Sequence, residues 1–239
     1  MTLLEEINQV RRWRDGQIEA ICKINSELYQ RILITTCIDA FVQHQSSIYE
    51  EKKGKNRQNR DKFSAFLQKY VDDQPYSKWL SLICPTTLYY DYERDLGGES
   101  LRLMTGRIYF ADDSDALSEA NRLIMLLPEE KRIVAQKKHQ YSALIYQMRN
   151  KLVQEMIYVG CQANFCTEDS DPIPQMVTQS KSDGNRLMPY KWTLHIPVSL
   201  LMHCLKSSTD NYLNECTQQG KNPLGEYSPE QKSIFAFYD

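Results

Sequence analysis

The sequence predicts a mainly α-helical bundle with a short β element in its C-terminal third. Apolar residues recur every three or four positions over two long segments, residues 17–47 and 129–159, which predicts helices. Apolar and polar residues alternate only in the short run KWTLHIPV at 191–198, which predicts a strand. We expect a single domain over residues 1–239, with a helical core at about 17–159 and a strand and helix extension at about 190–219.

The first long helix carries an apolar stripe that widens in its second half, so this half is expected to be central and nearly fully buried. Asp39 lies inside the apolar stretch. A buried acid needs a hydrogen-bonding partner. Asp39 is therefore either a hydrogen-bonded structural carboxylate or a carboxylate that orients an arginine of a site.

Three shorter helices are expected on either side of the second long one. An amphipathic pattern begins near residue 63 and stops before Pro75, and a capped apolar pattern runs from 114 to Pro128. A last helix is expected from 199 to about 219. The aromatic and then glycine-rich segment 85–107 has no assignable pattern, and the proline-rich segment 161–189 predicts a long loop.

A run without apolar residues, EEKKGKNRQNRDK at 50–62, predicts a solvated loop. The net charge of −2 creates no global field that would attract nucleic acid, so such binding would need a local patch of this kind. The run is either ordinary surface or a contact surface for phosphates, to which lysine and arginine bind electrostatically. Its positive residues are Lys52, Lys53, Lys55, Arg57, Arg60 and Lys62.

Composition excludes several classes of protein. The longest apolar run, 32–42, is far shorter than the roughly 20 residues that span a bilayer, and the N-terminus lacks the features of a signal peptide. We therefore expect a cytoplasmic protein that does not bind membranes. The seven cysteines are odd in number and lie mostly in apolar stretches, as free thiols do.

We expect neither a metal nor a cofactor. Cys161 and Cys166 form the one close cysteine pair, and a zinc site would need further ligands from downstream, such as His195 or His203 with Cys204. Structural zinc sites usually show two tight ligand pairs, so this is the less favoured alternative. No H-x-x-x-H pair and no G-x-S-x-G motif is present, which gives no support to a metalloprotease or a serine hydrolase.

The most informative segment lies in the second long helix and reads YQMRNKLVQE from Tyr146. Asn150 and Gln154 are four residues apart and share a helix face. Arg149 and Gln154 differ by about 140° around the helix, so they flank one groove. Polar side chains among apolar neighbours on a partly buried helix need partners, either in the same chain or across a dimer.

This hexapeptide resembles the signature of the HEPN superfamily of helical domains, in which Arg and a polar residue are followed by three variable residues and a His. Gln154 stands where the family has the histidine. The resemblance extends loosely to the segment around Asp39, the segment 59–63 and the strand at Trp192. It implies a HEPN-like bundle and a metal-independent endoribonuclease, in which two protomers bring their motifs together over one phosphodiester.

In such an enzyme the 2′-hydroxyl of RNA attacks the adjacent phosphorus, the histidine transfers protons, and the arginine stabilises charge on the phosphoryl oxygens. Glutamine has no proton that titrates near neutral pH, so the chain as written is expected to be catalytically impaired or inactive. The resemblance implies catalytic positions at Arg149, Asn150 and Gln154, with Asp39 as a possible orienting acid. The candidate substrate-binding residues are Tyr146 and Lys151 beside the motif, and Lys53, Lys55, Arg57 and Arg60 of the basic run.

The implied partners are a second copy of the chain, RNA, and an antitoxin or regulatory protein of a toxin–antitoxin or defence system. A different class of function stays open, namely a non-enzymatic helical interaction protein that binds a protein partner. Nucleotide binding in the same groove is a third possibility. In a purely structural alternative, Arg149, Asn150 and Gln154 only hydrogen-bond helix ends and loops within the bundle.

Overall fold

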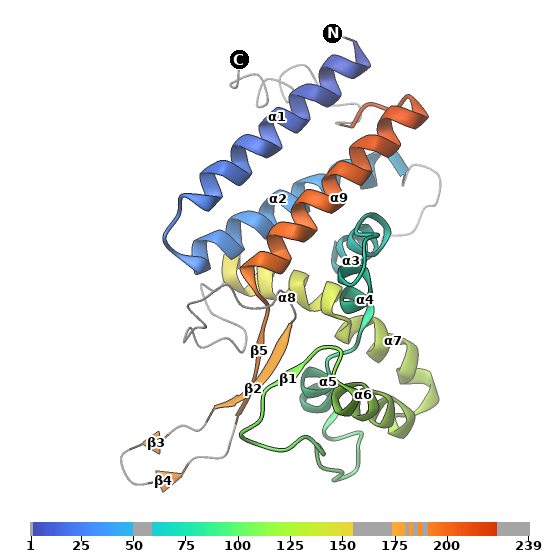
Figure 1. Cartoon of the computed structure of the whole chain (residues 1–239). Coiled ribbons are helices and arrows are strands. Elements are labelled where there is room, and N and C mark those ends of the chain that lie inside the picture. Colours follow the sequence, from blue (N-terminus) through green and yellow to red (C-terminus); the bar gives the residue numbers. More distant parts are fainter. Residues whose placement is uncertain are drawn as a thin grey trace. The chain divides into compact units, whose positions relative to one another are not determined.

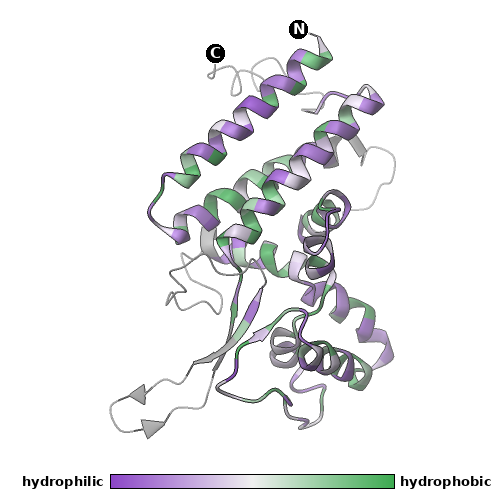
Figure 2. Ribbon diagram, viewed as in Figure 1, coloured by the Kyte–Doolittle hydropathy of each residue, from purple (hydrophilic) through white to green (hydrophobic). Residues whose placement is uncertain are grey.

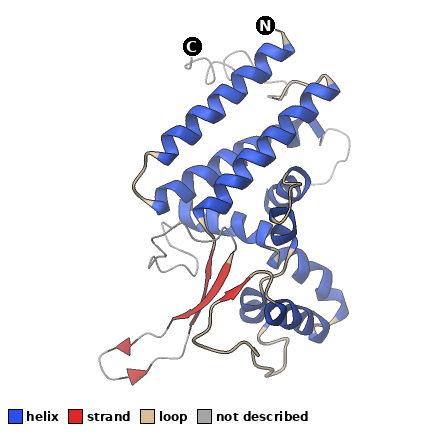
Figure 3. Ribbon diagram, viewed as in Figure 1, coloured by secondary structure: helices blue, strands red, loops and turns tan. Residues whose placement is uncertain are grey.

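The computed structural model describes residues 2–49, 59–154, 174–179, 182–183, 186–187 and 191–223. Helices dominate these residues, and a small antiparallel sheet lies in the C-terminal part (Figure 1, Figure 3). The predicted mainly α fold with a short β element is confirmed. The chain divides into two compact units, Met1–Asp73 with Leu201–Asp239, and Gln74–Leu200. The single domain stays a prediction.

The first unit is built from long helices. It holds α1 (Leu3–Cys22), α2 (Glu27–Tyr49), α3 (Asn59–Tyr70) and nearly all of α9 (Val198–Gln219). Apolar and hydrophilic residues alternate along α1, as expected for a helix with one buried face (Figure 2). The helix predicted at 199–219 is confirmed as α9.

The predicted single helix over 17–47 is wrong, because α1 ends at Cys22 and α2 begins at Glu27. The side-chain amide of Gln30, in the first turn of α2, donates hydrogen bonds to the carbonyls of Ile21 (3.3 Å) and Ile24 (3.0 Å). These bonds satisfy carbonyls that the end of α1 leaves without helical partners. The start of α1 has a readable signal, since Thr2 and Glu5 form a reciprocal capping box.

Tyr212 of α9 lies at the centre of an aromatic cluster in the first unit. Its ring meets the rings of Phe66 and Tyr70 edge-on, with centroids 5.8 Å and 5.6 Å away, and its hydroxyl donates a hydrogen bond of 2.9 Å to the carbonyl of Pro223. Phe41 of α2 approaches the same ring at 6.3 Å. Edge-to-face aromatic pairs add to the stability that area burial provides, so this cluster ties α2, α3 and α9 together.

The second unit contains the remaining described helices. They are α4 (Tyr76–Ser81), α5 (Pro85–Tyr92), α6 (Ser114–Leu126), α7 (Glu129–His139) and α8 (Tyr141–Gln154). The helix predicted between 114 and Pro128 is confirmed as α6. α5 lies in the segment that had no assignable pattern.

The predicted single helix over 129–159 is also wrong, because it breaks at Gln140 into α7 and α8. Residues 139–141 pair with the extended segment 82–84 instead of continuing the helix: the amide of Cys84 bonds the carbonyl of His139 (2.9 Å) and the amide of Tyr141 bonds the carbonyl of Leu82 (3.0 Å). A tertiary hydrogen-bond pair thus replaces the helical ladder at this point. No helical periodicity could reveal it, because the partner segment lies more than fifty residues earlier.

Three strands form an antiparallel sheet in the order β1 (Tyr109–Phe110), β2 (Gln175–Gln179) and β5 (Lys191–His195). β5 confirms the strand that the alternating pattern at 191–198 predicts. The predicted long loop over 161–189 is wrong for its second part, which supplies β2 and the short pair β3 (Ser182–Asp183) and β4 (Arg186–Leu187). Gly-Asn, the dipeptide between β3 and β4, is a hairpin signal in the sequence.

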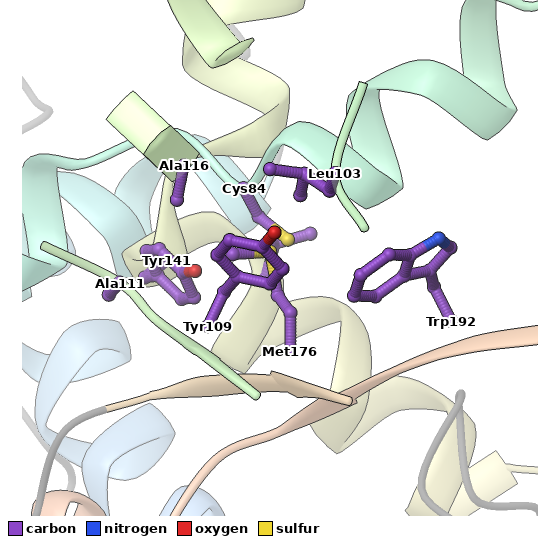
Figure 4. Close-up of a cluster of buried hydrophobic side chains, with 9 residues drawn as sticks. Cys84, Leu103, Tyr109, Ala111, Ala116, Tyr141, Met176 and Trp192 are labelled. Carbon is purple, nitrogen blue, oxygen red and sulfur yellow. The ribbon is translucent and has the colours of Figure 1, made fainter. Parts of the chain in front are cut away.

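A buried apolar cluster joins this sheet to the helices of the second unit (Figure 4). Met176 pairs with Leu194 across the sheet, and the rings of Tyr109 and Trp192 lie 5.9 Å apart. Tyr141, the first residue of α8, is fully buried in the same cluster, and burial raises the pKa of its phenol well above the usual value. The cluster therefore fixes the start of α8.

A charged network anchors the loop before β1 to α6. Glu119 is only 5% exposed, and its carboxylate accepts two hydrogen bonds from Arg122 and one from the amide of Arg102, all at 2.8 Å. Arg122 also donates to Glu99 at 2.9 Å. Burial alone would raise the pKa of Glu119, but the hydrogen bonds from Arg122 and Arg102 outweigh it and hold this pKa below 4.5.

We expect Glu119→Gln to lower the free energy of unfolding by about 1.5–3 kcal/mol at neutral pH, because the charged hydrogen bonds are lost. The folded state binds the proton of Glu119 less tightly than the unfolded state, so the contribution is complete above pH 4.5 and disappears as the pH falls through the lowered pKa. Thermal unfolding of the two proteins, measured at neutral pH and at acid pH, should show a difference in stability that shrinks as the pH falls below 4.5. Glu93→Gln, at an exposed position, is the control. If Glu119→Gln lowered the stability equally at neutral and at acid pH, the role assigned to the charge of Glu119 would be contradicted.

Candidate functional site

The candidate site lies at the C-terminal end of α8, in the second unit. From Tyr141 to Met148 nearly every residue of α8 is buried, whereas Arg149 and Asn150 are half-buried and Lys151 is exposed. The helix thus emerges from the core where its polar residues begin. The sequence correctly predicts that this segment is helical, and the packing of the first turns holds its last turns in place.

Arg149 and Asn150 are in direct contact. The Nη1 atom of Arg149 donates a hydrogen bond of 3.0 Å to the Oδ1 atom of Asn150. This bond uses one of the five guanidinium donors and orients the planar group. Lys151 adds a second positive charge in the same turn, where the negative end of the helix dipole favours cations.

The side chain of Tyr146 is described in the structure, but that of Gln154 is not. Tyr146 is only 8% exposed and packs within the unit. Gln154 is the last residue of α8, but its side chain lies outside the described part of the structure. Arg149 and Asn150 are therefore the members of the predicted site that the structure brings together.

The predicted basic loop is described only at its end. Lys53, Lys55 and Arg57 lie outside the described residues. Arg60 belongs to the first turn of α3, so the prediction of a loop is wrong at this position. Its Nε and Nη2 atoms donate hydrogen bonds of 3.1 Å and 3.0 Å to the same oxygen of Asp61, which partly neutralises the charge it could offer to a phosphate.

Asp39 lies on α2, in the first unit. It is half-buried rather than fully buried, and its Oδ1 atom accepts a hydrogen bond of 3.3 Å from the side-chain amide of Gln43, one turn along the helix. This contact fits the structural alternative for Asp39. It provides no evidence that this acid orients an arginine.

His139 does not replace the missing histidine of the motif. It ends α7 rather than lying on the helix of Arg149, and it is 1% exposed. Its Nδ1 atom lies 3.1 Å from the hydroxyl of Thr87, and its Nε2 atom lies 3.4 Å from the carboxylate of Asp91. These contacts join α7 to α5, so the role of His139 is structural.

The described cysteines are free thiols, and most of them are buried. Burial raises the pKa of Cys37 to about 11 and that of Cys204 to about 12. Both thiols stay protonated at neutral pH and are poor nucleophiles. The zinc alternative rests on Cys161 and Cys166, which lie outside the described residues, and no cluster of metal-binding side chains occurs in the part of the chain that is described.

Comparison with known proteins gives no relative: no family model, no curated protein and no solved structure matches the chain. Among the described helices, none has both the length and the apolar character that crossing a membrane requires. The polar residues at the end of α8 are therefore the basis for assigning a function.

One surface feature is not predicted by the sequence patterns. Ile133 and Val134 of α7 are 64% and 56% exposed, and Met125 at the end of α6 is 66% exposed. A single helix over 129–159 with one apolar face would bury such residues. Because the helix breaks at Gln140, α7 and α8 do not share one continuous apolar face, and Ile133 and Val134 are exposed to solvent.

Proposed function

We propose that the end of α8 binds RNA and that Arg149 contacts a backbone phosphate. The observation that supports this most is the hydrogen bond from Arg149 to Asn150, because it orients a guanidinium at the point where the helix leaves the core. Arginine binds phosphate through paired N–H donors, and an oriented guanidinium loses less freedom on binding. The resemblance of this segment to the HEPN motif agrees with the same role.

The proposed protein is a HEPN-like RNA-binding homodimer whose ribonuclease activity is weak or absent. The amide of Gln154 can hold a phosphate oxygen or a water molecule but cannot transfer protons near neutral pH. Binding without efficient cleavage is the expected outcome, because one group of the motif binds phosphate and another moves protons. Its proposed setting is a toxin–antitoxin or defence system, in which an RNA-binding chain of this kind would be held by a partner protein.

RNA binding can be tested with a fluorescently labelled single-stranded RNA and anisotropy titrations at several salt concentrations. We expect affinity to fall as salt rises, with a slope of about −0.7 for each phosphate contacted. Arg149→Ala should reduce the magnitude of this slope by about 0.7, since one phosphate contact is lost. No binding at low salt, or an affinity that does not depend on salt, would contradict the proposal.

A second candidate function is favoured by the exposed aliphatic residues of α6 and α7. A non-enzymatic interaction protein would use such a surface to bind another protein, since exposed apolar patches commonly mark interfaces. This candidate predicts a stable complex with a partner protein and no affinity for RNA. It is compatible with the same fold, and the RNA titration separates the two.

A further inference from the structure

The outward face of α7 carries an acid, two aliphatic residues and a base in order. These four residues, Glu130, Ile133, Val134 and Lys137, are here called the α7 stripe, and all are exposed. Glu130 and Lys137 are seven residues apart, about two helical turns, so they lie on one face with the aliphatic pair between them. α7 is otherwise mostly hydrophilic (Figure 2).

The opposite face of α7 is fully engaged within the second unit. Ala135 and His139 are buried, and Lys131 and Lys138 form ion pairs with Asp95 and Asp91. Arg132 of the same helix donates to the carbonyls of Leu127 and Met125, both at 2.9 Å. The stripe is therefore held on a helix whose orientation is fixed.

The charged ends of the stripe differ from Lys131, Arg132 and Lys138 of the same helix, which bond other residues of the unit. Neither Glu130 nor Lys137 forms an ion pair or a side-chain hydrogen bond with any residue that the structure describes. The stripe thus has an exposed acid at one end and an exposed base at the other, two turns apart, with exposed aliphatic residues between them. Turning the stripe end to end exchanges the positions of the acid and the base.

We propose that the α7 stripe is the surface through which two copies of this chain associate, with the two α7 helices antiparallel about a two-fold axis between Ile133 and Val134. Glu130 lies three positions before Ile133, and Lys137 lies three positions after Val134. The two-fold axis therefore places Glu130 of each copy opposite Lys137 of the other. The same operation brings the aliphatic pairs together, as a self-complementary dimer surface requires.

Charge order favours a second copy over another protein as the occupant. An acidic or basic partner would complement one end of the stripe and repel the other, whereas a second copy complements both. The stripe is short, so we expect a weak dimer, with a dissociation constant on the order of 0.1 mM. The inference deepens the proposed pairing of two copies and rests on it, but it does not depend on RNA binding.

Charge reversal tests the pairing directly. Sedimentation equilibrium of the full chain up to about 1 mM should show that Glu130→Lys and Lys137→Glu each weaken the dimer about tenfold, because each change occurs twice across the two-fold axis and puts like charges opposite each other. The double variant Glu130→Lys/Lys137→Glu restores opposite charges, and we expect its affinity to return to within about threefold of the wild type. Glu93→Lys, the same change at an exposed position outside the stripe, should have no effect.

Ile133→Asp supplies an independent variant, which should abolish dimerisation. Because Ile133 is exposed, this change should not alter the melting temperature of the second unit. A dimer that none of the stripe variants weakens would overturn the inference while leaving the proposed pairing intact. A wild-type chain that stays monomeric at the highest concentration would overturn both. Neither outcome bears on RNA affinity, which the anisotropy titration measures separately.

Discussion

Replacing Gln154 with histidine is expected to produce metal-independent cleavage of RNA, with a rate about 10²–10⁴-fold above that of the wild type. The histidine would supply the proton transfer that glutamine cannot, because its ordinary pKa lies near neutral pH. The 2′-hydroxyl of the substrate would then attack the adjacent phosphorus while the 5′-oxygen of the next nucleotide leaves. Cleavage in the presence of a chelator, read from end-labelled RNA on a gel, measures this gain.

Two further variants make the result specific. Gln154→Asn retains an amide and should stay inactive, whereas Arg149→Ala combined with Gln154→His should lose most of the gained activity because the phosphoryl charge is no longer stabilised. A bell-shaped dependence of the gained rate on pH is expected, since the imidazole of one protomer must take a proton while that of its partner gives one. If the histidine variant folds, binds RNA and cleaves no RNA at all, a masked ribonuclease site on α8 is ruled out.

The second large effect concerns stability. Tyr212→Ala is expected to lower the free energy of unfolding by about 3–5 kcal/mol, because it leaves a cavity among Phe41, Phe66 and Tyr70 and removes the hydroxyl that bonds Pro223. Urea denaturation followed by far-ultraviolet circular dichroism measures the loss. The first unit should be the part that unfolds.

Tyr212→Phe separates the two contributions, since it keeps the ring and removes only the hydrogen bond, for an expected loss of about 1–3 kcal/mol. Tyr29→Ala, at an exposed position of the same unit, is the matched control and should change stability by less than about 0.5 kcal/mol. A Tyr212→Ala protein as stable as the Tyr29→Ala protein would show that the aromatic cluster does not hold α9 to α2 and α3.

The elements that the sequence predicts well are those whose ends have local causes. α6 follows an apolar repeat that Pro128 terminates, and α9 follows an uninterrupted apolar stripe. The breaks that divide α1 from α2 and α7 from α8 have distant or side-chain causes, namely the amide of Gln30 and the backbone pairing at Gln140. Periodicity cannot contain this information, because the residues on either side of each break keep a helical pattern.

The candidate site shows the same division. Its position on a helix, with Arg149 and Asn150 where the core ends, follows from the alternation of apolar and polar residues in the sequence. The contact between these adjacent side chains does not, because neighbouring positions on a helix point about 100° apart and their rotamers decide whether they meet. Arg60 is a similar case, since its pairing with Asp61 depends on α3 beginning at Asn59.

The central claim, that the end of α8 holds RNA, is tested most directly by the ratio of two RNA affinities measured at one salt concentration. Arg149→Ala is compared with Arg94→Ala, an exposed arginine in the same unit but outside α8. Both variants lose one positive charge, so only the position of the charge differs. We predict that Arg149→Ala binds about 10–100-fold more weakly than Arg94→Ala, as expected for the loss of a hydrogen-bonded charge pair with phosphate. Equal affinities in two well-folded variants would contradict the claim.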